Sequence, residues 1–290
     1  MVSMKAVAIK HLDRSRAAGK HYSSEGSATR VFGSDGVGLL PDGTRVYGIG
    51  FSGTMAKTAS LRKDTLVLIP DGLDDATAAA LPNAVIGSAM GLKFKAGIQP
   101  GDVVLVNGAT GFTGRIAVQI AKHYGAGRVI ATGRNRESLN ELLSLGADET
   151  ISLSQPGFRQ ELARIHAATP IDIVVDYLWG ESAEMILGCL KGNGGFTNEM
   201  RYISIGAMSG ESIQLSAASL RSANLQLTGS GLGAWSRSEV GILFREILPE
   251  MFGLAVSGGL QLKVATLKLE DIASVWDVDV PGGERLVVTI

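Results

Sequence analysis

The stretch VNGATGFTGRIAVQIAKHYGAGRVIATGRN, residues 106–135, holds three glycines at intervals of three, Gly108, Gly111 and Gly114. An apolar run, VVLVN at 103–107, comes directly before them and has the composition of a buried strand. Glycines at this spacing let a strand turn sharply into a helix. The stretch therefore predicts a strand that ends in a tight, glycine-rich loop.

A helix and a second strand follow the loop. Ile116, Ile120 and Tyr124 recur every four residues with alanines beside them, which predicts one apolar helix face. Gly125 supplies a helix stop, and RVIAT at 128–132 is the next apolar strand. The order strand, loop, helix and strand is that of a dinucleotide-binding βαβ unit.

Each glycine has a separate task in such a unit. The first permits the turn, the second lets a pyrophosphate approach the backbone, and the third lets the helix lie close to the strand. The N-terminus of the helix offers N–H groups to the anion. A purely structural turn would use the same glycines, but the flanking elements favour dinucleotide binding. The predicted pyrophosphate-binding residues are Gly108, Ala109, Thr110, Gly111, Phe112, Thr113 and Gly114.

The end of the second strand indicates which dinucleotide would bind. NAD sites place an acid about 20 residues after the loop to bind the ribose 2′-hydroxyl. Here the positions are Gly133, Arg134, Asn135 and Arg136. Because a guanidinium pairs with a 2′-phosphate, these four residues are predicted to bind NADPH. The alternative is that the two arginines only cap a solvent-exposed turn.

The rest of the chain divides into two parts with different residue patterns. From residue 101 on, apolar strands alternate with helix-like segments, which predicts an α/β fold with a doubly wound parallel (Rossmann) sheet. Residues before about 88 are rich in short extended runs, and the tail after 233 returns to this β-rich region. The predicted domains are 1–88 with 234–290, and 89–233. The six strand candidates are 103–107, 128–132, 149–153, 171–177, 201–206 and 225–229.

Composition excludes several classes of protein. The net charge of −1 and the lack of a basic run argue against nucleic acid as a partner. The longest uncharged stretch, residues 76–92, is slightly short for a bilayer and is predicted to be a buried helix, so no membrane partner is expected. The single cysteine, Cys189, excludes an intramolecular disulfide, fits a reducing cytoplasm and is expected to lie in the core.

These motifs together resemble the medium-chain dehydrogenase/reductase superfamily, in its zinc-independent quinone oxidoreductase-like branch. The likeness runs from GSDGVG at 33–38 and GTRVYG at 43–48 through the glycine loop to LKLEDI at 267–272. It implies a GroES-like catalytic domain beside the Rossmann domain, and NADPH-dependent reduction of a quinone or an α,β-unsaturated carbonyl, usually in a homodimer. The segment YISIGA at 202–207 matches a later strand of the family, which adds Ile205, Gly206 and Ala207 to the cofactor-binding residues.

The resemblance also suggests catalytic residues. AVAIKHLD at 6–13 is similar to the family's third-strand motif, with Lys10 where the family has Asn. Lys10 or Tyr22 would then donate to the substrate oxygen, and Asn83 would face the nicotinamide, with Ser88 near the family's usual threonine. The alternatives are a solvated strand residue for Lys10, a packing residue for Tyr22, and helix caps or core polar groups for Asn83 and Ser88.

No metal site is expected. The four histidines are scattered along the chain, and the Gly-His-Glu motif and four-cysteine lobe of the zinc-dependent relatives are missing. Quinones and enones need less Lewis-acid help than simple carbonyls, because conjugation spreads the developing charge. Zinc-independent reduction is therefore the expected chemistry.

Two departures from the family pattern stand out. If residues 6–13 are the third-strand motif, the hairpin that usually precedes it is absent. A second alignment makes MKAV at 4–7 the first strand and places the deletion after it. Either way we expect a truncated β domain with an exposed edge or a loosened substrate cleft. The glycine-rich segment 191–200 has no functional account.

Other functions stay open at this point. Short-chain reductases share the glycine loop but place it near the N-terminus and need a Tyr-x-x-x-Lys pair, which no tyrosine of this chain provides. A non-catalytic NADPH-binding or regulatory protein is the main alternative. Reduction of a carrier-bound enoyl group cannot be distinguished by sequence from reduction of a free substrate.

Overall fold

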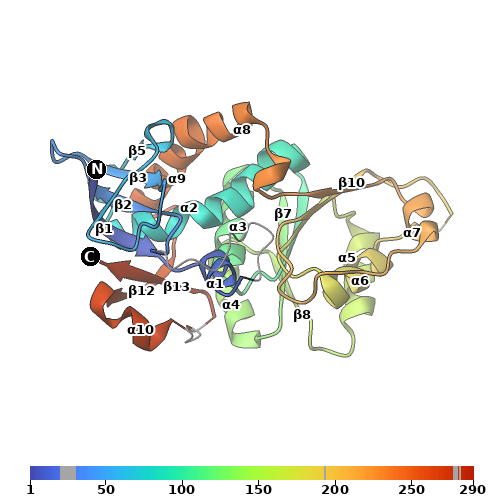
Figure 1. Ribbon diagram of the computed structural model, residues 1–290. Coiled ribbons are helices and arrows are strands. Elements are labelled where there is room, and N and C mark those ends of the chain that lie inside the picture. Colours follow the sequence, from blue (N-terminus) through green and yellow to red (C-terminus); the bar gives the residue numbers. More distant parts are fainter. Residues whose placement is uncertain (20–30, 193, 277–279, 281) are drawn as a thin grey trace. The chain divides into compact units, whose positions relative to one another are not determined.

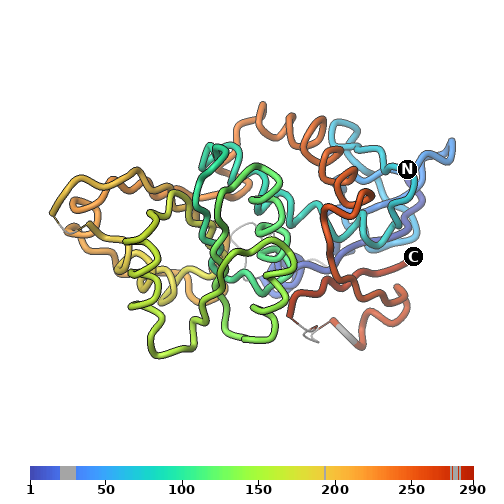
Figure 2. Tube along the Cα trace, turned by 180° about the vertical axis from the view of Figure 1, so that it is seen from behind, coloured from blue at the N-terminus to red at the C-terminus, as the bar shows by residue number. Residues whose placement is uncertain are grey.

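The computed structural model describes residues 1–19, 31–192, 194–276, 280 and 282–290. The chain forms two compact units, one of Met1–Asn83 with Val240–Ile290 and one of Ala84–Glu239. We call them the β-rich unit and the parallel-sheet unit. Both termini belong to the β-rich unit, where they lie on neighbouring strands (Figures 1 and 2). The unit boundaries lie within six residues of the domain boundaries predicted at 88 and 234.

All six predicted strands of the parallel-sheet unit form. They pair in parallel in the order β11-β10-β9-β6-β7-β8, so the chain winds outward from β6 in one direction and then from β9 in the other. This confirms the predicted doubly wound α/β fold. The strands are β6 Val103–Asn107, β7 Arg128–Gly133, β8 Glu149–Ser152, β9 Ile173–Asp176, β10 Met200–Ser204 and β11 Leu225–Gly229.

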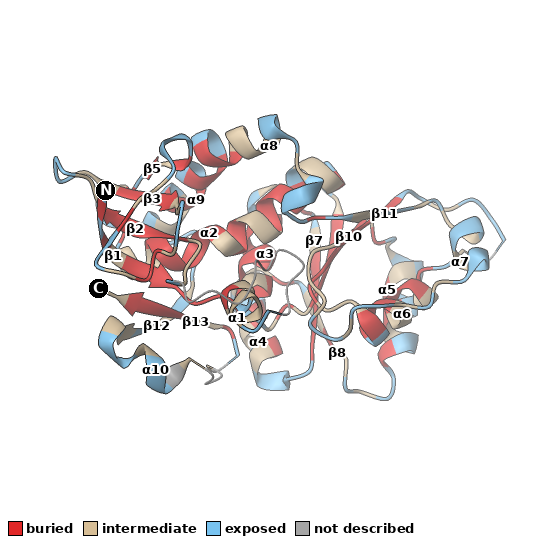
Figure 3. Cartoon of the chain, viewed as in Figure 1, coloured by how far each residue is buried: buried red, intermediate tan, exposed pale blue. Residues whose placement is uncertain are grey.

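Helices alternate with these strands because their apolar faces match the sheet. In α3, Phe112–His123, the residues Ile116 and Ile120 are fully buried, and Gly125 with φ +89° follows the end of the helix. The central strands β6, β7 and β9 are buried along almost their whole length, as the red colour of β7 shows in Figure 3. The other helices of the unit are α4 Arg136–Ser144, α5 Phe158–Ala168, α6 Gly180–Cys189 and α7 Ala217–Ser222.

Two further helices cross the unit boundaries. The stretch predicted as a buried helix forms α2, Asp75–Met90, and continues as a π-helical turn at Gly91–Ala96. Near the second boundary α8, Arg237–Ile242, a π-helical turn at Leu243–Ile247 and α9, Leu248–Val256, follow one another. Cys189 ends α6 and is only half-buried at the edge of the core.

The β-rich unit is built on a mixed sheet of short strands. The tail of the chain pairs with its beginning, because β13 is antiparallel to β1 and parallel to β12. Along the described strands the pairing path is β12-β13-β1-β2-β3-β5, with β4 beside β1, and its ends do not meet. The edge strand β12 has exposed and half-buried residues only. The elements are β1 Val2–Ala8, α1 His11–Ala17, β2 Asp35–Leu39, β3 Arg45–Ile49, β4 Thr58–Ala59, β5 Val67–Leu68, β12 Lys263–Lys268, α10 Ile272–Val275 and β13 Glu284–Thr289.

Candidate functional site

The glycine loop joins β6 to α3, and two of its glycines are required by the chain itself. Gly108 has φ +85°, a conformation that side-chain-bearing residues rarely adopt, and a Cβ there would lie 2.9 Å from Cγ of Leu178. A Cβ on Gly114 would overlap the carbonyl oxygen of Gly108 and lie 2.6 Å from Cα of Ala109. The turn and the close approach of α3 to the loop therefore explain these two residues.

Gly111 differs from its two neighbours. Its φ of −75° suits any residue, it is exposed, and the nearest atom to a Cβ there would be the Gly108 oxygen at 3.7 Å. Neither backbone strain nor packing within the described chain calls for glycine at this position. A ligand that approaches the backbone closely would call for it, as a pyrophosphate does.

The N-terminus of α3 is open to an anion. Gly111 is its N-cap and contributes no side-chain hydrogen bond to the first turn. By contrast, α4 is capped by Asn135, whose side-chain oxygen accepts from the Ser138 amide at 2.9 Å. The amides and dipole at the start of α3 are those that bind phosphates in dinucleotide sites.

The end of β7 brings cations to the same carboxyl edge of the sheet. Thr110 packs on Gly133, where a Cβ would lie 2.5 Å from the Thr110 Cγ2. Arg134 and Arg136 follow as exposed residues, and among the described residues neither guanidinium has a carboxylate within ion-pair distance. Both positive charges are therefore available to a ligand.

A buried polar network at this edge was not foreseen from the sequence. The Asp176 carboxylate, with no exposed surface, accepts from Asn107 Nδ2 at 2.7 Å and from the Tyr202 hydroxyl at 2.7 Å. Asn107 also donates to Ser182 and accepts from Thr132. Burial raises the pKa of Asp176, although its hydrogen bonds counteract the shift. The available signal was an Asp and an Asn that each end a buried strand.

The predicted residues after β10 join the same edge. The Ile205 amide donates to the Asp176 carbonyl oxygen at 2.8 Å, and the Gly206 amide donates to it at 3.2 Å. A Cβ on Gly206 would lie 2.6 Å from the backbone carbonyl oxygen of Tyr177, and Ala207 is half-buried. The structure thus gathers the glycine loop, the β7 end and the β10 end at one edge of one sheet.

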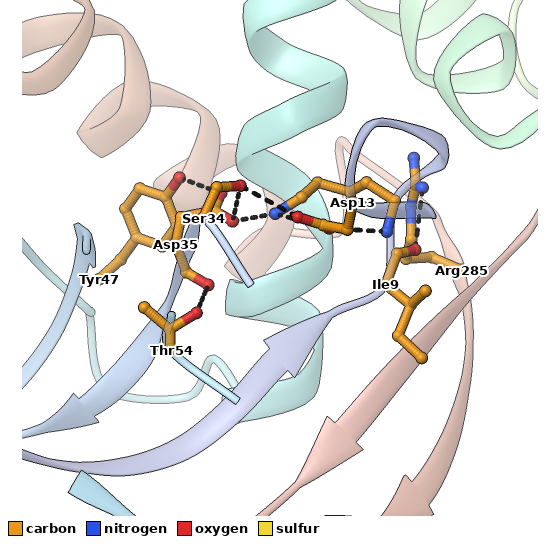
Figure 4. Close-up of polar contacts among 8 residues, drawn as sticks. Ile9, Asp13, Ser34, Asp35, Tyr47, Thr54 and Arg285 are labelled. Atoms are coloured by element: carbon orange, nitrogen blue, oxygen red, sulfur yellow. Dashed lines mark hydrogen bonds and ion pairs between the residues drawn. The ribbon is translucent and has the colours of Figure 1, made fainter. Parts of the chain in front are cut away.

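Lys10 lies in the β-rich unit within a buried cluster of charges, whose carboxylates belong to Asp13 and Asp35, labelled in Figure 4. Its ammonium forms ion pairs with the carboxylates of Asp35 and Asp13, and only 2% of Lys10 is exposed. The alternative of a solvated strand residue is therefore wrong, because Lys10 is buried and stands between β1 and α1. Burial alone would lower the pKa of Lys10, but the two carboxylates outweigh it and raise the pKa above its usual value.

Further contacts hold the cluster in place. The Tyr47 hydroxyl donates to Asp35 at 2.6 Å, and Thr54 donates to the Asp35 carbonyl oxygen at 2.8 Å. Arg285 lies close by and donates to the carbonyl oxygen of Ile9 at 3.3 Å, as Figure 4 shows. Burial lowers the pKa of Arg285 to about 10. The Lys10 ammonium is thus occupied by Asp35 and Asp13, whereas Arg285 donates to a backbone carbonyl.

The remaining predicted residues have the following positions. Asn83 is half-buried inside α2, and Ser88 is buried there with its hydroxyl donating to the Ala84 oxygen at 2.6 Å. Both lie in the middle of a helix, so the alternative of helix caps is wrong. Tyr22 lies outside the described residues.

The described residues offer neither a cluster of metal-ligating side chains nor a helix that could cross a membrane. No group of three or more His, Cys, Asp or Glu side chains gathers there as a metal site would require. No described helix combines the length and apolar character that a bilayer crossing needs.

Several known proteins and one family model are similar to this chain in sequence. A family model for zinc-binding dehydrogenases matches residues 113–247. The chain is 28% identical to a "probable NADPH-dependent quinone reductase" of Emericella nidulans over 98% of this chain and 90% of that protein. It is 30% identical to a quinone oxidoreductase-like protein 2 homolog of Nematostella vectensis over 70% of this chain, but it spans only about half, 54%, of that relative.

A solved structure of a quinone oxidoreductase is also similar to this chain. The quinone oxidoreductase of Thermus thermophilus, which was also solved in complex with NADPH, superimposes with a TM-score of 0.76 at 25% identity. The match covers all of this chain and 90% of that one. Fold, glycine loop and relatives agree along the chain, which is therefore similar to the quinone oxidoreductase-like branch of the medium-chain dehydrogenase/reductase superfamily.

Proposed function

We propose that this protein is an NADPH-dependent oxidoreductase that reduces a quinone or an α,β-unsaturated carbonyl without zinc. One observation carries the proposal. At the carboxyl edge of the parallel sheet, the N-terminus of α3 is uncapped behind an unobstructed Gly111, and Arg134 at the end of β7 has no ion-pair partner among the described residues. An anion-binding turn with a cation one strand away fits a dinucleotide that carries a 2′-phosphate.

The residues of the loop divide the work of binding. Amides in the first turn of α3, including those of Thr113 and Gly114, would hold the pyrophosphate over Gly111. Arg134, with Arg136 beside it, would pair with the 2′-phosphate, which a carboxylate at the same position would repel. Ile205, Gly206 and Ala207 would contact the nicotinamide half, since they follow the next strand but one along the same edge.

The bound cofactor supplies a hydride from C4 of its nicotinamide. A conjugated acceptor spreads the negative charge that develops, so modest electrostatic help from the protein suffices. Lys10, Tyr22 and Asn83 remain the proposed catalytic residues. Of these, Lys10 would have to act while its ammonium is paired with Asp35 and Asp13, which favours a role in holding positive charge over a role as a mobile proton donor.

Assembly and location complete the proposal. By its resemblance to the family, we expect the protein to act as a homodimer in the cytoplasm. Size-exclusion chromatography with light scattering would give the mass of the assembly. A mass near one chain, 30.3 kDa, would contradict the dimer.

The test of the function is absorbance at the reduced-nicotinamide band, with the protein mixed with NADPH or NADH and a panel of quinones and enones. We expect oxidation of NADPH in preference to NADH, unchanged by a chelator. Oxidation of NADH alone would contradict the role of Arg134, and loss of activity on chelation would contradict zinc independence.

A non-catalytic NADPH-binding protein is the second candidate. The observation that favours it is the occupied state of Lys10, whose charge is neutralised inside the β-rich unit. Tight NADPH binding with no turnover against any acceptor of the panel would support this candidate.

A further inference from the structure

Asp176 occupies a central position at the carboxyl edge of the parallel sheet. It ends β9 and pairs in register with Asn107, which ends β6, at the point where the strand order reverses. Besides Asn107 and Tyr202, its carboxylate accepts from two backbone amides of the following turn, Leu178 at 2.8 Å and Trp179 at 3.2 Å. One buried carboxylate therefore joins two strands and a turn.

The turn that Asp176 holds is an unusual one. Trp179 has φ 56° and ψ −154°, and it is the only described residue other than glycine with positive φ. Such a conformation persists only where surrounding contacts fix it. The amides of Leu178 and of Trp179 itself both donate to Asp176, and the Trp179 ring packs edge-on against Tyr202 with centroids 6.3 Å apart. Asp176 thus stabilises a backbone shape that would otherwise relax.

That shape places Leu178 directly on the glycine loop. The Leu178 side chain fills the space beside Gly108, where its Cγ would lie 2.9 Å from a Cβ. The Leu178 carbonyl oxygen accepts from the Ser209 amide at 2.7 Å, which ties the loop after β10 to the same turn. The glycine loop and the loop after β10 consequently meet at the turn that follows Asp176.

We infer that Asp176 is a positioning residue for the cofactor: it fixes the turn at 177–179 so that Leu178 packs on Gly108 and holds the glycine loop in its binding shape. The effect on NADPH rests on the proposed function, whereas the effect on the loop does not. Asp176 does not itself contact the cofactor and acts through Leu178.

The test combines NADPH affinity, from fluorescence of the reduced nicotinamide, with hydrogen exchange of the unliganded protein. Asp176→Ala should weaken NADPH binding about tenfold and speed amide exchange in 106–114 and 177–180. Leu178→Ala should weaken binding without removing the carboxylate. The double variant should bind within about twofold of Asp176→Ala alone, because both changes disrupt one contact path.

Two conservative variants separate positioning from general stability. Asp176→Asn keeps an oxygen that accepts from the Leu178 and Trp179 amides, so its NADPH affinity should stay within about twofold of the wild type. Tyr202→Phe removes a hydrogen bond to the same carboxylate but leaves the turn amides bonded. It should lower the melting temperature and leave NADPH affinity within about twofold.

Several results would overturn the inference. They are Asp176→Ala that folds and binds NADPH like the wild type, additive effects of the Asp176 and Leu178 changes, or unchanged exchange in 106–114. If Asp176→Ala does not fold, Leu178→Ala and Asp176→Asn decide by the same two readouts. If the wild type binds no NADPH, the proposed function fails, and the exchange data on the unliganded variants alone decide whether Asp176 holds the loop.

Discussion

Asp176 in the parallel-sheet unit and Lys10 in the β-rich unit are both buried, but the groups around their charges differ. In the parallel-sheet unit, the carboxylate of Asp176 is surrounded by neutral donors, and the arginines that follow β7 are exposed, with no ion-pair partner in the described part of the chain. In the β-rich unit, the carboxylates of Asp35 and Asp13 surround the buried ammonium of Lys10. The charges of those arginines are not neutralised by any described residue, whereas the charge of Lys10 is neutralised within the fold. The difference favours the parallel-sheet unit as the site of the proposed anionic cofactor.

The same difference has an energetic side. A buried carboxylate that accepts several hydrogen bonds from neutral groups has its charge solvated by those donors and holds them in place. A buried ion pair gains little over an apolar pair, but loss of one partner leaves an uncompensated charge. The β-rich unit should therefore be sensitive to removal of single charges, and the parallel-sheet unit to changes in backbone geometry.

Removal of the Lys10 charge is the strongest way to break this comparison. Lys10→Met leaves Asp35 and Asp13 buried beside each other without the ammonium, so the free energy of unfolding should fall by about 3 to 5 kcal/mol. Urea denaturation followed by circular dichroism measures the loss. Lys57→Met, at an exposed lysine of the same unit, is the control and should change stability by less than about 0.5 kcal/mol. A loss below about 1 kcal/mol for Lys10→Met would show that the cluster is not held by its charges.

The glycine loop offers a matched pair of backbone changes. Gly114→Ala places a methyl group against the Gly108 carbonyl, so α3 must shift, at a cost of about 1 to 3 kcal/mol. Gly111→Ala meets no described atom closer than 3.7 Å and should leave stability within about 0.5 kcal/mol, yet it should weaken NADPH binding. Thermal unfolding and nicotinamide fluorescence on both variants test this. Equal losses of stability would remove the argument that a ligand requires Gly111.

The same contrast explains how much could be predicted from the sequence. The parallel sheet, its six strands and the roles of Gly108 and Gly114 follow from local patterns, because a turn and a close helix contact depend on residues near in sequence. Lys10 pairs with Asp35, 25 residues away, and Asp176 pairs with Asn107, 69 residues away. No periodic pattern in the neighbouring sequence reveals contacts between residues so far apart. Lys10 was therefore noticed only as a departure from a motif, and Asp176 was missed.

A change at Arg134 tests whether the exposed arginines after β7 bind the 2′-phosphate. Arg134→Ala should raise the KM for NADPH about tenfold, roughly 1.4 kcal/mol, and leave the KM for NADH unchanged, because only NADPH carries the 2′-phosphate. Steady-state kinetics with both cofactors measure the split. Arg159→Ala, at an exposed arginine on α5 of the same unit, is the matched control and should alter neither constant. An equal rise for both cofactors would assign Arg134 to the shared part of the dinucleotide.

The smallest expected effect concerns His166, whose neutral imidazole accepts a hydrogen bond within the parallel-sheet unit. Its Nδ1 accepts from the Ile171 amide at 3.0 Å, and burial lowers its pKa below the usual 6.5. The unfolded chain therefore takes up the proton at higher pH than the folded chain. Stability should be lost as pH falls below about 6.5, and none of this loss should occur well above that pH.

His166→Gln keeps an acceptor oxygen but cannot titrate, so the melting temperature should fall less between about pH 7 and about pH 5 than in the wild type. Because the ring is only partly buried, the difference should be about 1 °C or less. His11→Gln, at an exposed histidine of the β-rich unit, controls for loss of a histidine as such. A His166→Gln variant with the full acid dependence of the wild type would place that dependence in other groups. The buried Asp176 is not one of them, because its raised pKa makes the folded chain take up a proton at higher pH than the unfolded chain does.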